Sequence, residues 1–130
     1  METEGKRIRV AMYCRVATDT DVGPGIGIQK EQLYRYAKQQ GYDIVKEIIE
    51  IAKGDTLERA GIREICSMAR RHAMDKVLAV NMERFGRKAE DVLRLESNLK
   101  KQNVRLDTPQ GNPLAGYGEI VKALGRRYME

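Results

Sequence analysis

Strand-like and helix-like segments alternate along this chain, and this alternation constrains the fold more than any other feature of the sequence. Segments rich in β-branched or alternating apolar residues, typical of strands, lie at 6–14, 43–51, 76–80 and 104–106. Between them, apolar residues recur at helical spacing over 29–40, 61–71 and 89–102, and again, more weakly, from residue 113 onward. The alternation predicts an α/β fold with a mostly parallel sheet of about four or five strands, helices on both faces, and a long C-terminal helix.

Length and composition restrict the class of protein. The 130 residues suffice for one domain, and we expect residues 1–130 to form it alone. No stretch approaches the ~20 apolar residues of a membrane span, and the acidic N-terminus does not resemble a signal peptide. The two cysteines, Cys14 and Cys66, are too few for a disulfide framework and lie at no metal-ligand spacing. We therefore expect free thiols, no metal site, no membrane contact and a cytoplasmic location.

The charge balance points to an anionic partner. The formal net charge is +5 and the isoelectric point is near 9.3, which favours nucleic acid over a membrane surface. The chain has no Trp and one Phe, so it lacks the aromatic platform on which single-stranded bases stack. We expect contacts to the nucleic-acid backbone before contacts to bases.

Arginines follow the first three predicted strands. Binding sites of parallel sheets lie at the carboxyl ends of the strands, where this sequence places Arg15, Arg59, Arg84 and Arg87. Grouped together, they would form a phosphate site, because the guanidinium fork matches phosphate oxygens and stays charged when partly buried. The pattern leaves an alternative open, in which these arginines are solvated or paired on the surface with Glu58, Glu83, Glu90 and Asp91.

Four short motifs resemble, in order, those of the serine recombinases, the resolvase and invertase family of site-specific DNA recombinases. Residues 13–19 are similar to Y-x-R-V-S-T-D, and residues 29–42 to Q-x-x-x-L-x-x-Y-A-x-x-x-G-Y. Residues 54–62 resemble S-G-T-S-L-E-R-P-G-L after its first residue, and residues 83–87 resemble D-R-F/L-G/S-R. The resemblance covers residues 7–110 and implies a resolvase-like catalytic domain.

The resemblance also implies a reaction. Its members cut and rejoin double-stranded DNA through serine attack on a backbone phosphate, with no metal or nucleotide cofactor, and act as dimers or tetramers. The matching active-site positions in this chain are Arg15, Arg59, Arg84 and Arg87, with Gln29, Glu50 and Glu83. A homodimer or tetramer through the C-terminal helix is expected, and Lys122, Arg126 and Arg127 on that tail are candidates for further phosphate contacts.

This chain departs from the family at the reacting position. The nucleophilic serine of the motif falls on Ala17, whose methyl group cannot attack phosphorus, and the side chain of Thr18 points in another direction. We therefore expect no DNA cleavage by the chain as written. The DNA-binding module that follows the catalytic domain in the family is expected to be absent from residues 1–130.

Three hypotheses follow for the function. The first is a recombinase catalytic domain that has lost its nucleophile. The second is a stand-alone noncatalytic protein with the same fold, acting in dimerisation, DNA binding or regulation of an active recombinase. The third is a flavodoxin-like protein that binds small anions.

Overall fold

The computed structural model describes residues 6–17 and 25–112, and its elements alternate as the sequence predicts. The strands are β1 (Arg9–Val16), β2 (Asp43–Ile51), β3 (Lys76–Leu78) and β4 (Arg105–Asp107). The helices are α1 (Ile26–Gln40), α2 (Ala60–Arg70), the short 3-10 helix η2 (Met82–Arg84) and α3 (Ala89–Lys100). The expected C-terminal helix from residue 113 onward, with Lys122, Arg126 and Arg127, lies outside the described residues.

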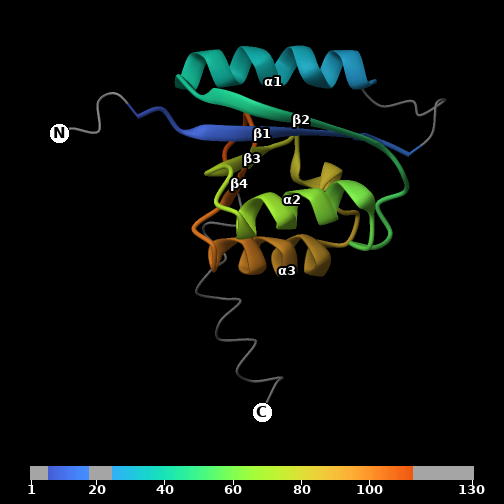
Figure 1. Ribbon diagram of the computed structural model, residues 1–130. Helices are drawn as coiled ribbons and strands as arrows, with labels where there is room; N and C mark the ends of the chain where they lie inside the picture. Colours follow the sequence, from blue (N-terminus) through green and yellow to red (C-terminus); the bar gives the residue numbers. More distant parts are fainter. Residues whose placement is uncertain (1–5, 18–24, 113–130) are drawn as a thin grey trace.

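The four strands form one parallel sheet in the order β2-β1-β3-β4. Helix α1 covers one face of this sheet, and α2 and α3 cover the other (Figure 1). The predicted α/β class, with a parallel sheet and helices on both faces, is therefore confirmed. The strand order reverses beside β1, because the chain continues from β1 to β2 on one side and returns to β3 on the other. Ligands of such sheets bind at this switch point.

Element boundaries follow local chemistry. Strand β2 has the predicted bounds, because its β-branched residues favour an extended backbone. Helix α1 ends at Gly41, whose left-handed φ of 73° lets Tyr42 N–H donate to the carbonyl of Ala37 at 2.9 Å. Strand β3 ends at Leu78, two residues earlier than predicted, because the chain turns into η2, where the side chain of Asn81 accepts a hydrogen bond from Arg84 N–H.

Strand β1 divides the core into two layers. Its residues Ala11 and Tyr13 pack among α2 and α3, together with Ile65, Leu95 and other buried residues. Its residues Val10, Met12 and Cys14 face the opposite side and pack beneath α1. Burial on both faces makes β1 the rigid centre of the domain. Both cysteines are free, and no helix of the described segments is long and apolar enough to cross a membrane.

Candidate phosphate site at the carboxyl edge of the sheet

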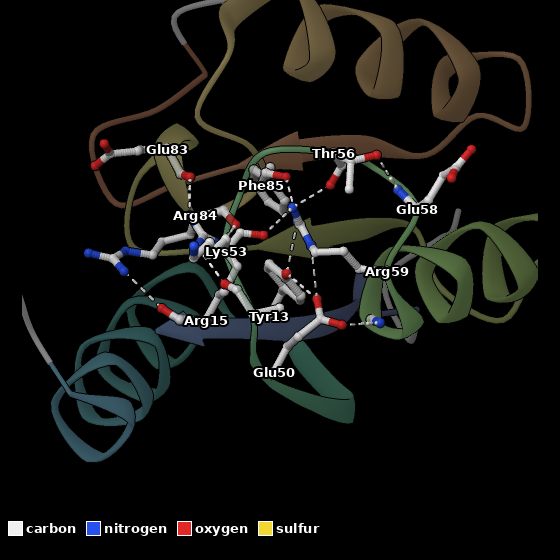
Figure 2. Close-up of polar contacts among 12 residues, drawn as sticks. Tyr13, Arg15, Glu50, Lys53, Thr56, Glu58, Arg59, Glu83, Arg84 and Phe85 are labelled. Carbon is white, nitrogen blue, oxygen red and sulfur yellow. Dashed lines mark hydrogen bonds and ion pairs between the residues drawn. The ribbon is translucent and has the colours of Figure 1, made fainter. Parts of the chain in front are cut away.

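Several of the candidate residues converge at the carboxyl edge of the sheet, where Figure 2 shows Arg15, Glu50, Arg59, Glu83 and Arg84. Arg15 is the last but one residue of β1 and Ala17 directly follows the strand, Glu50 lies near the end of β2, and Arg59 caps the start of α2. Arg84 closes η2 after β3. Four separate segments therefore contribute side chains to one edge, as the parallel topology requires.

Arg15 binds the protein's own backbone. Its side chain is buried, and Nε donates to the carbonyl of Arg84 at 2.7 Å, Nη1 to Ala52 at 2.9 Å and Nη2 to Glu83 at 2.8 Å. Burial, together with the charges of neighbouring arginines, lowers the pKa of Arg15. With three of its five donors committed to carbonyl oxygens, Arg15 fixes the loops after β2 and β3 around the end of β1.

Arg59 and Glu50 form a buried ion pair. Arg59 Nε lies 3.2 Å from Glu50 Oε1, and the two side chains are 4% and 9% exposed. Glu50 also accepts from Tyr13 Oη at 2.6 Å and from Gly61 N–H at 2.6 Å. Burial, with the hydrogen bond to Glu50, raises the pKa of Tyr13, so its phenol stays protonated and donates. The cluster fastens β1 and β2 to the N-terminus of α2.

The remaining donors of Arg59 also bind the protein. Nη1 donates to the carbonyl of Thr56 at 2.7 Å, and Nη2 donates to the carbonyl of Phe85 at 2.8 Å and to Tyr13 Oη at 3.1 Å. Arg59 therefore joins the loop after β2 to the turn after β3.

Arg84 and Arg87 have donors left for a ligand. Arg84 is 8% exposed, its Nη1 donates to the carbonyl of Arg15 at 2.8 Å, and its buried Nε has no hydrogen-bond partner among the described residues. Arg87 is exposed, and its Nη1 lies 3.5 Å from Asp55 Oδ1. Together with Arg15, Ala17 and Glu83, they line a cavity of about 170 Å³. The cavity thus combines a buried cation, an exposed cation and the methyl group of Ala17.

The other two candidates have different surroundings. Gln29 is fully buried, donates from Nε2 to the carbonyl of Arg15 at 3.0 Å and accepts from Arg15 N–H at 3.2 Å, so it holds the end of β1. The residue Glu83 is exposed and reaches Arg15 through its backbone carbonyl. Neither residue's location assigns it a chemical step.

The surface-pair alternative is wrong for three of the four arginines. Arg15, Arg59 and Arg84 are buried, with carbonyl oxygens and Glu50 as their partners. The alternative describes only Arg87, and its partner is Asp55, which was not among the four acids considered.

Gly54 and Asp55 lie against the arginines of the site, and the sequence did not predict either as a site residue. A Cβ on Gly54 would lie 2.7 Å from Arg15 Nη2 and 2.8 Å from Arg87 Cγ, so any larger residue would push the two arginines aside. The carbonyl of Gly54 also accepts from Arg87 N–H at 2.9 Å. One feature of the sequence could have identified Asp55. In the motif that residues 54–62 resemble, threonine follows the glycine, whereas this chain has aspartate there.

Comparisons with known proteins agree with the fold. The family description "Resolvase, N terminal domain" matches residues 10–121. The N-terminal catalytic domain of TP901-1 integrase is similar, with a TM-score of 0.78 and 23% identity over 91% of this chain and 94% of that one. A resolvase family site-specific recombinase from Streptococcus pneumoniae has a TM-score of 0.74 and 23% identity, over 92% of this chain and 85% of that one.

A third solved structure is also similar. The C-terminal catalytic domain of ISC1926 TnpA, an IS607-like serine recombinase, has a TM-score of 0.71 and 25% identity, over 90% of this chain and 78% of that one. No curated protein matches the chain.

Proposed function

The chain belongs to the family of resolvase N-terminal domains, and from this premise we propose that it is a recombinase-type domain that binds double-stranded DNA without cutting it. A backbone phosphate would occupy the cavity between Ala17, Arg84 and Arg87. In the serine mechanism, a hydroxyl group at the position of Ala17 attacks the phosphorus, and a methyl group cannot do so. Binding and cutting are therefore separable in this chain.

The Nε of Arg84, which has no acceptor within residues 6–17 and 25–112, carries the proposal. A buried N–H without an acceptor costs about 1–3 kcal/mol, and a charged donor costs more. Arg84 lines a cavity that an exposed second arginine, Arg87, three residues further along the chain, also lines. A phosphate oxygen in the cavity would supply the missing acceptor, and the guanidinium charge would balance its own.

The division of labour among the arginines supports the same assignment. Arg15 and Arg59 hold the loops by binding carbonyl oxygens, which leaves Arg84 and Arg87 to face the anion. Preorganised cations of this kind stabilise charge on phosphate oxygens at no cost of reorganisation. The site residues are assigned on this basis: Arg84 and Arg87 to phosphate, and Arg15, Arg59, Gln29 and Glu50 to the scaffold around it.

A binding assay tests the proposal. We expect Arg84→Gln and Arg87→Gln each to weaken binding of a short fluorescent duplex, measured by anisotropy, and to reduce the salt slope by about 0.9 per lost phosphate contact. Arg35→Gln, on the exposed side of α1, removes the same charge and serves as the control. Equal affinity of all four proteins would refute the site. Because Arg84 is buried, circular dichroism checks that the Arg84 variant still folds. Arg87 is exposed, so its replacement should not affect folding.

A cleavage assay separates the two recombinase-type hypotheses. The Ala17 protein is expected to form no covalent adduct with DNA on a denaturing gel. An adduct with Ala17→Ser would mean that the remaining site is competent and that only the nucleophile has been lost. No adduct would favour the stand-alone noncatalytic protein, because the replacements at other motif positions would then have removed activity as well.

Partners and location follow from the same proposal. Double-stranded DNA is the proposed partner, self-association through residues 113–130 remains a prediction, and a cytoplasmic location is consistent with a DNA-binding protein. The small-anion hypothesis makes a distinct prediction: inorganic phosphate would compete with DNA at similar phosphate concentration. A strong preference for the polymer would exclude it.

A further inference from the structure

Strand β2 forms an open edge of the sheet. It is nine residues long and, in the described part of the chain, pairs only with β1. Three of its side chains are large, apolar and strongly exposed: Val45 at 42%, Ile49 at 50% and Ile51 at 59%. Edge strands are usually protected by charge, proline or a covering element, because an open edge pairs readily with another strand.

The backbone groups of this edge also point outward. Ala52 N–H donates to the carbonyl of Val16 in β1 at 2.9 Å, and the direction of backbone groups alternates along a strand. The N–H and C=O groups of Glu47, Ile49 and Ile51 therefore point away from β1. The residues with exposed side chains are thus also the residues whose backbone groups are available for pairing.

Helix α1 leaves the side chains of this edge uncovered. Ile49 and Ile51 pair in register with Cys14 and Val16 of β1, and Cys14 packs beneath α1. Helix α1 meets β2 through a salt bridge of 3.2 Å between Lys30 and Glu47 and near Ile44, which packs against the cluster beneath α1. Figure 1 shows the N-terminal end of α1 and the C-terminal end of β2 on the same side of the molecule. An apolar strip remains along β2.

We propose that this edge pairs with β2 of a second copy of the chain, antiparallel and centred on Glu50. Glu50 at the centre is already neutralised by Arg59 of its own chain and faces α2. In this register Ile49 faces Ile51 of the second copy, so the isoleucines of both chains cover one another. Glu47 then faces Lys53 of the second copy, which matches opposite charges. Pairing centred on Glu47 would instead place the Glu47 carboxylates of the two copies opposite each other, and like charges in such a pair are unfavourable.

The interface uses none of the residues that line the cavity, and it does not involve residues 113–130. It would join the two four-stranded sheets into one continuous sheet and leave the cavity beside Ala17 at the carboxyl edge of each copy. The partner is a second copy of the chain because this edge is complementary to itself. Its apolar residues, Ile49 and Ile51, occupy alternate positions, and the opposite charges of Glu47 and Lys53 lie at the two ends.

Molar mass in solution tests the proposal. We expect the full chain to show concentration-dependent dimer formation by light scattering, and the double variant Ile49→Lys with Ile51→Lys to raise the dissociation constant at least about tenfold. Ile8→Lys is the matched control, because Ile8 is also an exposed isoleucine, at 41%, and lies outside β2. Glu47→Lys should weaken the dimer, and adding Lys53→Glu should restore it.

Amide hydrogen exchange provides a second readout that needs no substitution. The amides of Ile49 and Ile51 should exchange more slowly as protein concentration rises, because pairing occupies them. The proposal would be overturned by a monomer at all concentrations, by an average molar mass that the double variant does not lower, or by exchange at these amides that does not change with concentration. A monomer would leave the edge to a strand of another protein, and an unaffected dimer would place the contact elsewhere.

Discussion

Replacing Glu50 with glutamine should destabilise the domain strongly. Glu50 and Arg59 are almost fully buried, and the carboxylate accepts from Arg59 Nε, Tyr13 Oη and Gly61 N–H. A glutamine keeps the volume but removes the charge and turns one acceptor into a donor, facing either Gly61 N–H or the Arg59 side chain. Removing one partner of a buried ion pair costs about 3–5 kcal/mol. Because a domain of this kind has only about 5–15 kcal/mol of stability, Glu50→Gln would remain folded with a narrow margin.

Urea denaturation followed by circular dichroism measures the effect. With a slope of about 2 kcal/mol per molar urea, the midpoint should fall by about 1.5–2.5 M with the slope unchanged. Glu47→Gln is the matched control, because Glu47 pairs with Lys30 on the surface, where both side chains are about one-third exposed. Glu47→Gln should lower the free energy of unfolding by less than about 1 kcal/mol. Equal shifts for the two variants would refute the account of Glu50 as the centre of a buried cluster.

Three further predictions concern charge and burial. Burial raises the pKa of Asp75, but hydrogen bonds and charge from Arg9 lower it by more, so the net pKa is depressed. The stability that this interaction contributes is therefore present above pH ~4, and it is lost as the pH falls through the pKa of Asp75 in the folded state. The melting temperature of Asp75→Asn should therefore lie below that of the unsubstituted protein at pH 7 and approach it at pH 2, and a constant difference would contradict this. Asp55→Asn, which removes the carboxylate 3.5 Å from Arg87, should raise DNA affinity about threefold, and weaker binding would contradict the assignment of Arg87. Burial raises the pKa of Cys14 to about 11, so its thiol should resist alkylation at pH 8 until the protein unfolds; rapid labelling of the folded protein would show that β1 is less buried than described.

The fold could be predicted because its signals are local. The β-branched residues of β2 and the glycine after α1 act within a few residues of themselves, and they fix where these elements lie. The boundary of β3 could not be predicted in this way, because the turn at Asn81 depends on a hydrogen bond to Arg84 that the apolar pattern of residues 76–80 does not reveal.

The roles of the arginines were harder to predict. Position after a strand identifies which arginines reach the carboxyl edge, but it does not show whether their donors meet a ligand or a carbonyl oxygen. Arg15 and Arg87 have the same charge and lie at the same edge, yet one is buried against three carbonyls and the other is exposed. Backbone acceptors carry no residue-specific signal, so only the structure separates the two.

Nuclear magnetic resonance of arginine side chains tests the central claim most directly. The protein is labelled with nitrogen-15, the Nε–H signal of Arg84 is assigned through Arg84→Lys, and a short DNA duplex is added. We predict that this signal moves downfield as the Nε–H of Arg84 donates to a phosphate oxygen, and that its titration gives the same dissociation constant as fluorescence anisotropy. A stationary Arg84 signal, under conditions where anisotropy shows bound DNA, would place the DNA elsewhere on the protein and contradict the proposed site.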